Sequence, residues 1–280
     1  MALSPDPAQW WRTAIIDIAP GSIRVRGYAI EELIGAVSFP EMIWLMLRGD
    51  LPSPDQGALL GAVLVAAVDH GPQAPSIAIA RMAMTCGVGV NNAMASAVNA
   101  LGDVHGGAGQ QGMALYAAVA GRAGNGIALG AAAGAEIGAR LLRREHVPGF
   151  GHRFHPVDPR AGRLLTLVDE AARRGAVEGR FAAIGRAVEE ALAAAKGKRL
   201  PMNIDGATAV VLCELGFAPD EGRGLFILSR SVGILSHAME QKAQGGRIKG
   251  PMPPQVPYTY DGATPRTLPP KAAKAGETTP

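Results

Sequence analysis

The organisation of this chain is set by three glycine-flanked segments, which are GDVHGGA (residues 102–108), VPGFGH (147–152) and PMNIDG (201–206). Each segment holds an ionisable side chain beside glycine, namely His105, His152 or Asp205. Glycines beside such a residue let the atoms of a ligand approach the backbone closely, and loops often hold binding and catalytic groups. Taken singly, each segment is also explained as an ordinary turn whose polar residue satisfies a helix end.

Most of the remaining sequence has the periodicity of amphipathic helices. Two capping boxes, Ser38 with Glu41 and Ser53 with Gln56, each have a proline in the first turn and predict two helix starts. Gly49 predicts the end of the first of these helices, and Gly71-Pro72 that of the second. Further helices are expected over residues 160–175, 178–196 and 224–242. The last of them is expected to bury the face made of Leu225, Leu228, Val232, Leu235 and Met239.

A strand signal is confined to residues 13–27, where two isoleucine- and valine-containing runs flank Pro20-Gly21. Strands and helices do not alternate along the chain, so a parallel-sheet enzyme is not expected. The prediction is an all-α fold with a small N-terminal β-hairpin. Residues 253–280 lose the apolar periodicity, and seven prolines fall between Pro251 and Pro270, which predicts a disordered tail.

Composition narrows the classes of function. Hydrophobic residues make up 48% of the 280-residue chain and charged residues 18%, which excludes general disorder. Two cysteines are too few for a disulfide framework or a zinc site built from cysteines. The net charge of +3 suits a small anionic substrate better than a nucleic acid. Residues 1–11 show no signal-peptide pattern, and the longest apolar run is about half a membrane span. A cytoplasmic protein without a membrane partner is expected.

In order and spacing, these segments resemble the citrate synthase superfamily, and most closely its citryl-CoA lyase branch, which also forms the C-terminal part of ATP citrate lyase. The likeness spans about residues 13–251. It is carried by NIDG (203–206) within the third segment and by six further short motifs, which are RGY (26–28), SFPE (38–41), GDLP (49–52), DHG (69–71), DPR (158–160) and SRSVG (229–233).

The resemblance implies an all-α, citrate synthase-like fold of two domains. The large domain is expected to comprise residues 1–106 and 217–280, and the small domain residues 107–216. Closure of the small domain over the large one would exclude water from the site, as lids do. The resemblance also implies a homodimer with shared sites, substrates that are a CoA thioester and a 2-oxo acid, and no permanently bound cofactor.

The family makes or breaks a carbon–carbon bond between acetyl-CoA and a 2-oxo acid. The resemblance assigns Asp205 as the base at the thioester methyl carbon and His105 as the donor to the thioester oxygen. It assigns His152 as the acid at the ketone oxygen of the acceptor. In the cleavage direction the three roles are reversed.

Asp205 also has an argument that is independent of the resemblance. It precedes the apolar stretch 207–215, so it is expected near a helix N-terminus, where the dipole stabilises a carboxylate and keeps it available as a base. The alternative is an ordinary N-cap aspartate.

The resemblance places two groups of binding residues around these three. His70, Arg160 and Arg230 match the family's clamp on a dicarboxylate acceptor, and the planar fork of arginine suits that task. The structural alternatives are a histidine at a helix C-terminus for His70 and charges at helix surfaces for the two arginines.

The coenzyme loop of the family is matched by Val147, Gly149, Phe150 and Gly151. Four basic residues are candidates for the CoA phosphates, although a solvated surface also explains them: Arg143, Arg144, Arg247 and Lys249.

Three departures from the family pattern concern the acceptor. The position of a further acceptor-binding arginine, which the partner subunit supplies, falls on Gly250 here. Either Arg247 or Lys249 substitutes for it, or the acceptor lacks the corresponding carboxylate. The spacing from His152 to Arg160 is about one residue short. Gly109 stands where many synthases have asparagine.

The leading hypothesis is therefore cleavage of citryl-CoA, or a related 3-hydroxy-acyl-CoA, to acetyl-CoA and a 2-oxo acid such as oxaloacetate. The alternatives are condensation of the citrate or methylcitrate synthase type, and CoA binding without turnover. A metal hydrolase built from His70, His105, His152 and Asp205 is a weaker rival, because no helical metal-binding motif surrounds these residues.

Overall fold

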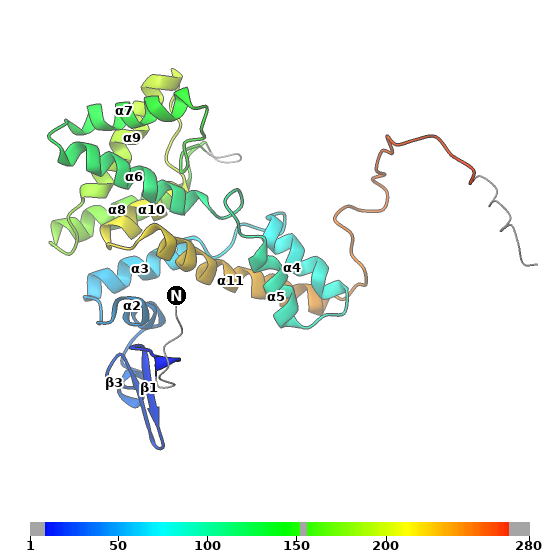
Figure 1. Ribbon diagram of the computed structural model, residues 1–280, viewed down its shortest axis with the longest axis horizontal. Helices are drawn as coiled ribbons and strands as arrows, with labels where there is room; N and C mark the ends of the chain where they lie inside the picture. The colour runs from blue at the N-terminus through cyan, green and yellow to red at the C-terminus, as the bar shows by residue number, and fades with distance from the viewer. Residues whose placement is uncertain (1–8, 152–155, 269–280) are drawn as a thin grey trace, which may run out of the picture.

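The protein is described by a computed structural model over residues 9–151 and 156–268. Within those residues it contains eleven helices and one small sheet (Figure 1), so the predicted all-α fold with an N-terminal β-structure is confirmed. The helices are α1 (Ile30–Leu33), α2 (Phe39–Arg48), α3 (Pro54–Ala66), α4 (Pro75–Thr85), α5 (Val90–Asn99), α6 (Ala108–Gly124), α7 (Leu129–Leu142), α8 (Pro159–Arg173), α9 (Arg180–Lys196), α10 (Ile204–Glu214) and α11 (Pro219–Gln244). None of the helices in the described ranges is long and apolar enough to cross a membrane.

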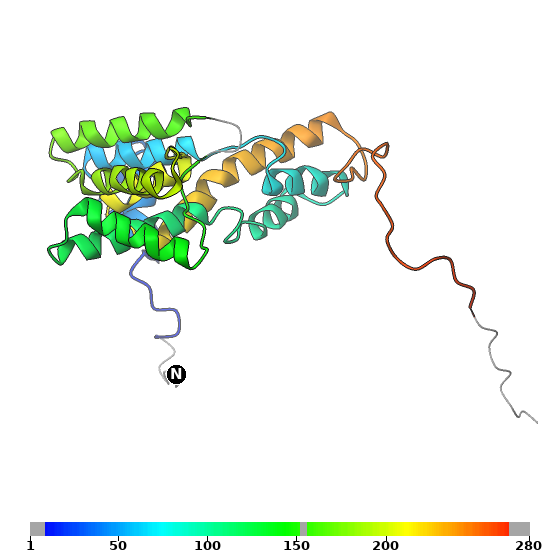
Figure 2. The same ribbon diagram turned by 90° about the horizontal axis from the view of Figure 1, so that it is seen from above.

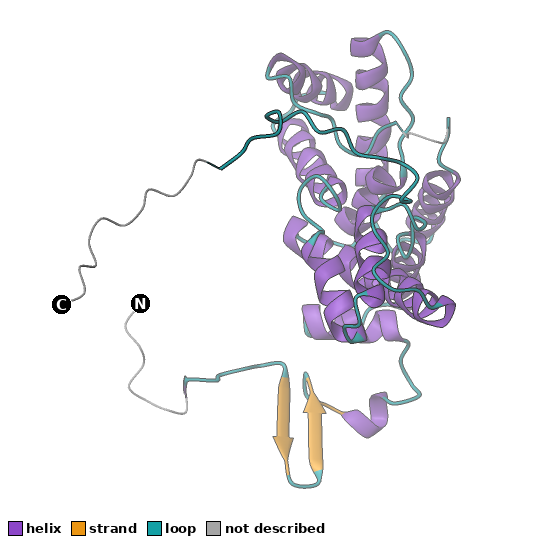
Figure 3. Ribbon diagram, turned by 90° about the vertical axis from the view of Figure 1, so that its right-hand side faces the viewer, coloured by secondary structure: helices purple, strands orange, loops and turns teal. Residues whose placement is uncertain are grey.

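The sheet has three strands, β1 (Ile16–Ala19), β2 (Ser22–Val25) and β3 (Tyr28–Ala29), in the antiparallel order β1-β2-β3. The predicted hairpin is β1-β2, in which Ala19 pairs with Ser22 across the Pro20-Gly21 turn. The third strand was not predicted. It follows a two-residue turn in which Arg26 and Gly27 both have positive φ, as tight hairpin turns require. Figure 3 shows the sheet at one end of the molecule, away from most helices.

Both predicted capping boxes are present. The amide of Ser38 donates to the Glu41 carboxylate at 2.6 Å, and the amide of Ser53 donates to the Gln56 side chain at 2.9 Å. Helix α2 ends at Gly49, which has a φ of 96°. These starts and this stop depend on neighbours within four residues, so the local sequence specifies them.

Helix α3 ends at Ala66, five residues before the predicted stop at Gly71. Two side chains of α11 bind its last carbonyls, with Ser229 Oγ donating to Leu64 O at 2.6 Å and Arg230 Nε donating to Ala67 O at 3.2 Å. Carbonyls at a helix end need hydrogen-bond partners. Because α11 provides these partners at Leu64 and Ala67, α3 ends before Gly71. Residues 67–71 are therefore a loop, which carries His70.

The main hydrophobic core is built around α10, whose residues from Gly206 to Leu212 are all buried. Helices α2, α3, α6, α7, α8, α9 and the first part of α11 contribute to the same core. A smaller core joins α4 and α5 to the second half of α11, which runs out from the main body in Figures 1 and 2. The predicted domain boundaries at residues 106/107 and 216/217 remain a prediction. Helices α2 and α3, assigned to the large domain, share the core of α6–α10.

The face of α11 that was predicted to be buried is mostly exposed. Leu225 is buried, whereas Leu228, Val232, Leu235 and Met239 are 48%, 55%, 40% and 45% exposed. The buried residues of the helix are instead Gly222, Leu225, Ser229, Arg230, Gly233, Ile234, Ala238 and Gln241. The inward face needs small residues, because a Cβ on Gly233 would overlap the carbonyl oxygen of Val68. The prediction was wrong because helical periodicity identifies an apolar stripe without showing what the stripe contacts.

Residues 253–268 contain no helix or strand and are exposed, and they extend away from the helical body in Figures 1 and 2. The remainder of the tail predicted to be disordered, residues 269–280, lies outside the described residues. Disorder of the tail therefore remains a prediction.

Two glycines set how closely the loop at residues 147–151 approaches α10. A Cβ on Gly149 would lie 2.7 Å from the Gly206 Cα, and a Cβ on Gly206 would lie 2.7 Å from the Met202 Cγ. Three hydrogen bonds join the same loop to the segment before α10, with Gly151 N donating to Pro201 O at 2.7 Å, Asn203 N to Gly149 O at 2.9 Å and Asn203 Nδ2 to Gly151 O at 2.7 Å. The loop is therefore fixed against the start of α10.

Gly206→Ala should lower the free energy of unfolding by about 1–3 kcal/mol, the usual cost of forcing an extra carbon into a packed site. The matched control is Gly134→Ala in α7, where nothing lies within 4 Å of the added Cβ. That control should raise stability by about 0.5–1 kcal/mol, because alanine favours a helix interior. Urea unfolding followed by circular dichroism compares the two. Equal effects of the two substitutions would contradict the proposed crowding at Gly206.

Candidate active site

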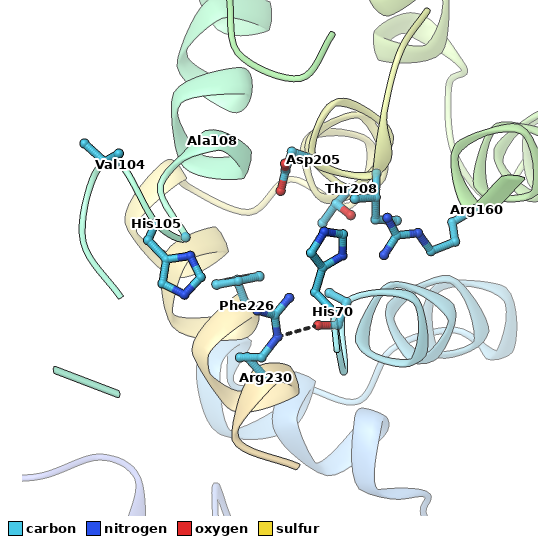
Figure 4. Close-up of a pocket in the computed structure, with 12 residues that line it drawn as sticks. His70, Val104, His105, Ala108, Arg160, Asp205, Thr208, Phe226 and Arg230 are labelled. Atoms are coloured by element: carbon cyan, nitrogen blue, oxygen red, sulfur yellow. Dashed lines mark hydrogen bonds between the residues drawn. The ribbon is translucent and has the colours of Figure 1, made fainter. Parts of the chain in front are cut away.

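One cavity of about 190 Å³ gathers side chains from five parts of the chain (Figure 4). They come from the loop after α3, the loop before α6 together with the first residue of α6, and helices α8, α10 and α11. The residues that line it are Ala67, His70, Val104, His105, Gly106, Ala108, Arg160, Ile204, Asp205, Thr208, Phe226 and Arg230. The structure thus brings together five of the six residues predicted for catalysis and acceptor binding. The sixth, His152, lies outside the described residues.

His105 is held by the first turn of α4. The amide of Ser76, a fully buried residue, donates to His105 Nε2 at 3.1 Å, and the Ser76 hydroxyl lies 3.0 Å from the same nitrogen. A nitrogen that accepts an amide hydrogen carries no proton, so we infer a neutral ring with its proton on Nδ1. Burial lowers the pKa of His105, and the charge of Arg230 lowers it further. The side chain is therefore a neutral hydrogen-bond donor near pH 7.

Asp205 lies in the first turn of α10 but does not cap the helix. The cap is Asn203, whose side-chain oxygen accepts from the amides of Asp205 at 3.0 Å and Gly206 at 3.3 Å. The alternative of an ordinary N-cap aspartate is therefore wrong for this residue. Because Asn203 satisfies the helix end, the Asp205 carboxylate extends into the cavity, where the helix dipole favours its ionised form.

Asp158 ties together the starts of α8 and α10. Its side chain is buried and accepts from Arg160 Nε at 3.0 Å, Arg160 Nη2 at 2.9 Å and the Ile204 amide at 3.0 Å. Burial would raise the pKa of Asp158, but the hydrogen bonds from Arg160 and Ile204 hold it below its ordinary value. The guanidinium of Arg160 therefore reaches the cavity already paired with a carboxylate.

Arg230 differs from Arg160 because no carboxylate within the described ranges forms an ion pair with it. It is only 6% exposed, its Nε donates to Ala67 O, and its guanidinium carbon lies 5.0 Å from the centre of the Phe226 ring. Burial lowers the pKa of Arg230, while the charges of Asp69 and Asp205 oppose that shift. An arginine stays protonated at neutral pH even so. The cavity therefore contains a buried cation suited to an anionic ligand.

His70 lines the cavity beside a second network. Its neighbour Asp69 accepts from the Gly71 amide at 3.1 Å and lies 3.3 Å from His237 Nε2 on α11. Burial would raise the pKa of Asp69, but these hydrogen bonds lower it. Asp69 therefore anchors the loop that presents His70.

The residues predicted to bind CoA do not line this cavity. Val147 and Phe150 are buried in the main core, and the amide of Gly151 donates a hydrogen bond to the carbonyl of Pro201. Arg247 and Lys249 lie beyond the end of α11, where the Lys249 amide donates to Thr85 Oγ1 and its ammonium to Gln241. At 1.5 Å per residue, the 14 steps along α11 from Arg230 to Gln244 span roughly 21 Å, so Arg247 and Lys249 are far from the cavity of the same chain. Arg143 pairs with Glu145 at the surface.

The rival metal site includes His152, which lies outside the described residues, so the full set stays untested. In residues 9–151 and 156–268, no group of three or more His, Cys, Asp or Glu side chains could hold a metal ion.

The sequence did not indicate several residues of the site. Ser76 lies 29 residues before the histidine it binds, so no local pattern connects them. Phe226 and Thr208 had a possible signal, since each lies one helical turn from a predicted site residue, at the spacing that shares a helix face.

Comparison with known proteins identifies the family. The family model of the citrate synthase C-terminal domain matches residues 52–251, which is most of the chain. The chain belongs to the citrate synthase family. The predicted family is thereby confirmed.

Relatives within this family include both synthases and lyases. The chain is 28% identical to citrate synthase 2 of Bacillus subtilis over 217 residues, which is 76% of this chain and 54% of that protein. It therefore spans about half the length of the curated relatives it matches. The structure of citryl-CoA lyase from Hydrogenobacter thermophilus has a TM-score of 0.82 at 30% identity, covering 93% of this chain and 98% of that one. ATP citrate lyase from Methanothrix soehngenii, solved with citrate and coenzyme A, shares the fold at a TM-score of 0.74 and 21% identity, over 93% of this chain and 43% of that one.

The lowered pKa of His105 predicts a pH dependence of stability. Because the folded-state pKa lies below the ordinary value of about 6.5, the contribution of His105 is complete above that value and is lost as the pH falls toward the folded-state pKa. In His105→Gln the amide oxygen can still accept from Ser76 but does not titrate. The free energy of unfolding should therefore fall less between pH 7.5 and pH 5 in the variant than in the wild type. Urea titrations at both pH values measure this, and equal losses in the two proteins would refute it.

Proposed function

We propose that this protein cleaves citryl-CoA, or a related 3-hydroxy-acyl-CoA, to acetyl-CoA and a 2-oxo acid such as oxaloacetate. One observation carries the proposal: a neutral imidazole donor, His105, and a carboxylate, Asp205, line the same cavity as a buried arginine that has no ion-pair partner in the described part of the chain. Breaking a carbon–carbon bond next to a thioester requires a donor for the enolate oxygen, a proton source for the carbon, and a cation for the acid that leaves.

The proposed cleavage starts at the hydroxyl group of the substrate. A base removes the hydroxyl proton, the carbonyl of the 2-oxo acid forms, and the electron pair of the broken carbon–carbon bond moves to the thioester as an enolate. In this direction Asp205 starts as the carboxylic acid, the form that the helix dipole disfavours. It gives its proton to the carbon, which produces acetyl-CoA and returns Asp205 to the favoured carboxylate. The resemblance assigns the base role to His152, which lies outside the described residues.

His105 supports the enolate in this proposal. The Ser76 amide fixes Nε2 as an acceptor, so Nδ1–H is the donor that would bind the enolate oxygen. A neutral imidazole suits this task, because its proton is held throughout and the bond strengthens as charge develops on the oxygen. A preorganised donor of this kind contributes roughly 3–4 kcal/mol to transition-state stabilisation.

The acid half of the substrate would bind to Arg230, with Arg160 and His70 beside it. Arg160 is already paired with Asp158, whereas Arg230 has no such partner among the described residues, so Arg230 should hold a carboxylate most strongly. The resemblance assigns the CoA half to residues 147–151, which lie against the start of the helix that carries Asp205. Because the Val147 and Phe150 side chains are buried, backbone groups of this loop would make the contact.

The runner-up is condensation of an acyl-CoA with a 2-oxo acid, favoured by the curated relatives, which are citrate synthases. The lyase direction is favoured by the match to a citryl-CoA lyase over nearly the full length of both chains. Gly250, which is exposed and offers no charge where the resemblance expects an arginine for the acceptor, bears on which acid is bound and not on the direction of the reaction.

The direct test incubates the purified protein with citryl-CoA, and separately with acetyl-CoA and a panel of 2-oxo acids, while thioester and free thiol are followed. Acetyl-CoA formed from citryl-CoA supports the lyase, and thiol released only in the second mixture supports the synthase. CoA binding without any turnover would refute both.

Asp205→Asn should lower turnover by about 10²–10⁴-fold, the usual contribution of a positioned acid or base. The matched control is Asp220→Asn, since Asp220 occupies the same position in the first turn of α11 but lies outside the cavity. Both variants should keep their thermal stability nearly unchanged, because neither removes a helix cap. Steady-state rates and melting temperatures measure this. A similar loss of activity in both variants would contradict the role of Asp205.

We also propose that the protein is a homodimer formed through an apolar groove between α2, α3 and α11. The groove has a volume of about 310 Å³ and is lined by Phe39, Pro40, Ile43, Gly61, Leu64, Val65, Val68, Leu228, Ser229 and Val232. Phe39 and Val65 are 75% and 74% exposed, which is unusual for neighbouring large apolar residues on a monomer.

Val232→Glu should convert the dimer to a monomer in sedimentation velocity, because it places a charge in the groove. Leu142→Glu at the end of α7 is the control, since Leu142 is 87% exposed but lies outside the groove. A monomeric wild-type protein, or dissociation caused equally by both variants, would refute this interface.

A further inference from the structure

Thr208 has a buried hydroxyl without a hydrogen-bond partner in the described part of the chain. The residue is 6% exposed and lines the cavity on α10, three positions after Asp205. Its Oγ1 is fully buried and forms no hydrogen bond with residues 9–151 or 156–268. A hydroxyl removed from water without a partner destabilises the fold, so such groups are rare and call for an explanation.

Other helical hydroxyls of this chain find partners. Thr166, Ser231 and Ser236 each donate to the carbonyl four residues earlier, at 3.0, 2.7 and 2.9 Å. That bond is the ordinary solution for Thr and Ser within a helix. For Thr208 the corresponding acceptor is the carbonyl of Ile204, and the hydroxyl does not use it. The described part of the chain therefore offers this hydroxyl no acceptor.

The surroundings of Thr208 indicate which kind of group would accept from its hydroxyl. Figure 4 shows Thr208 between Asp205 and the side chains of His70 and Arg160. Arg160 and Arg230, which line the same cavity, can only donate hydrogen bonds, so two guanidinium groups and a hydroxyl all have protons to give. A carboxylate has about four lone-pair sites, and an arginine fork occupies two of them. The carboxylate can therefore accept from the hydroxyl as well.

We propose that Thr208 is a specificity-determining residue whose hydroxyl donates to a carboxylate of the 2-oxo acid, or to the same carboxylate of the 3-hydroxy-acyl-CoA, bound at Arg230 and Arg160. The proposal rests on the proposed function and names the group of the substrate that this wall of the cavity recognises. Binding of the acid gives the hydroxyl its acceptor and removes the cost of burying it alone. The hydroxyl therefore favours acids over uncharged analogues of the same shape.

Thr208→Val tests the proposal, because it replaces the hydroxyl with a methyl group of similar size. Thr208→Ser is the matched control, since it keeps the hydroxyl and removes the methyl group. Without ligand, Thr208→Val should melt at the same temperature as the wild type or higher, because an unpaired buried hydroxyl is lost. A hydroxyl with a merely structural role would produce a lower melting temperature in the variant.

The dissociation constant of oxaloacetate, measured by thermal shift in the absence of CoA, should rise about tenfold in Thr208→Val. It should stay within about threefold of wild type in Thr208→Ser. The KM of citryl-CoA, which carries the acid, should also rise in Thr208→Val, whereas the KM of acetyl-CoA, which carries no acid, should not change. The proposal is overturned by wild-type affinity in Thr208→Val, by equal losses in the two variants, or by a fall in kcat alone, which would mean that Thr208 acts through Asp205.

The binding measurement separates this proposal from the proposed function. Oxaloacetate binding without turnover in the wild type refutes the lyase and synthase activities but still allows Thr208 to be judged from the two variants. Turnover with unaltered oxaloacetate affinity in Thr208→Val refutes only the role of Thr208. A wild-type protein that binds no dicarboxylate refutes both.

Discussion

The site depends on the contact between the end of α3 and the middle of α11. The side chains of Ser229 and Arg230 donate hydrogen bonds to the carbonyls of Leu64 and Ala67, respectively. Because Gly233 has no side chain, α11 packs closely against the carbonyl of Val68. This contact ends α3 early, turns the following residues into the loop that carries His70, and buries the Arg230 guanidinium at the same time. One interaction between elements about 160 residues apart thus places two residues of the cavity.

A second anchor places the other half of the site. The buried carboxylate of Asp158 joins the starts of α8 and α10, and so fixes Arg160 relative to the helix that carries Asp205. Asn203 caps α10 in place of Asp205, and the Ser76 amide holds His105 from α4. In each case a neighbouring residue takes over the structural task, and the ionisable side chain is left to face the cavity. A buried group that accepts several hydrogen bonds is well suited to such positioning.

The sequence predicted those features that depend on neighbouring residues or on the order of motifs. The capping boxes at Ser38 and Ser53 are complete within four residues, so they could be read directly. The cavity residues were predicted from a family resemblance, because nothing local to His105 or Arg230 shows that they meet. The early end of α3 and the Ser76–His105 bond could not be predicted, since both are made by distant segments. The buried face of α11 was misjudged because its inner residues are small or polar, whereas its apolar stripe is exposed.

The touching backbones at Gly149 and Gly206 limit how a site of this kind can be remodelled. Neither position has room for a Cβ, so exchanging side chains there cannot tune the distance between the loop and the helix. A wider or narrower gap between the loop at residues 147–151 and α10 requires insertions or deletions in the segments that flank this loop. Changing the width of this gap in the scaffold is therefore a problem of loop length rather than of residue choice.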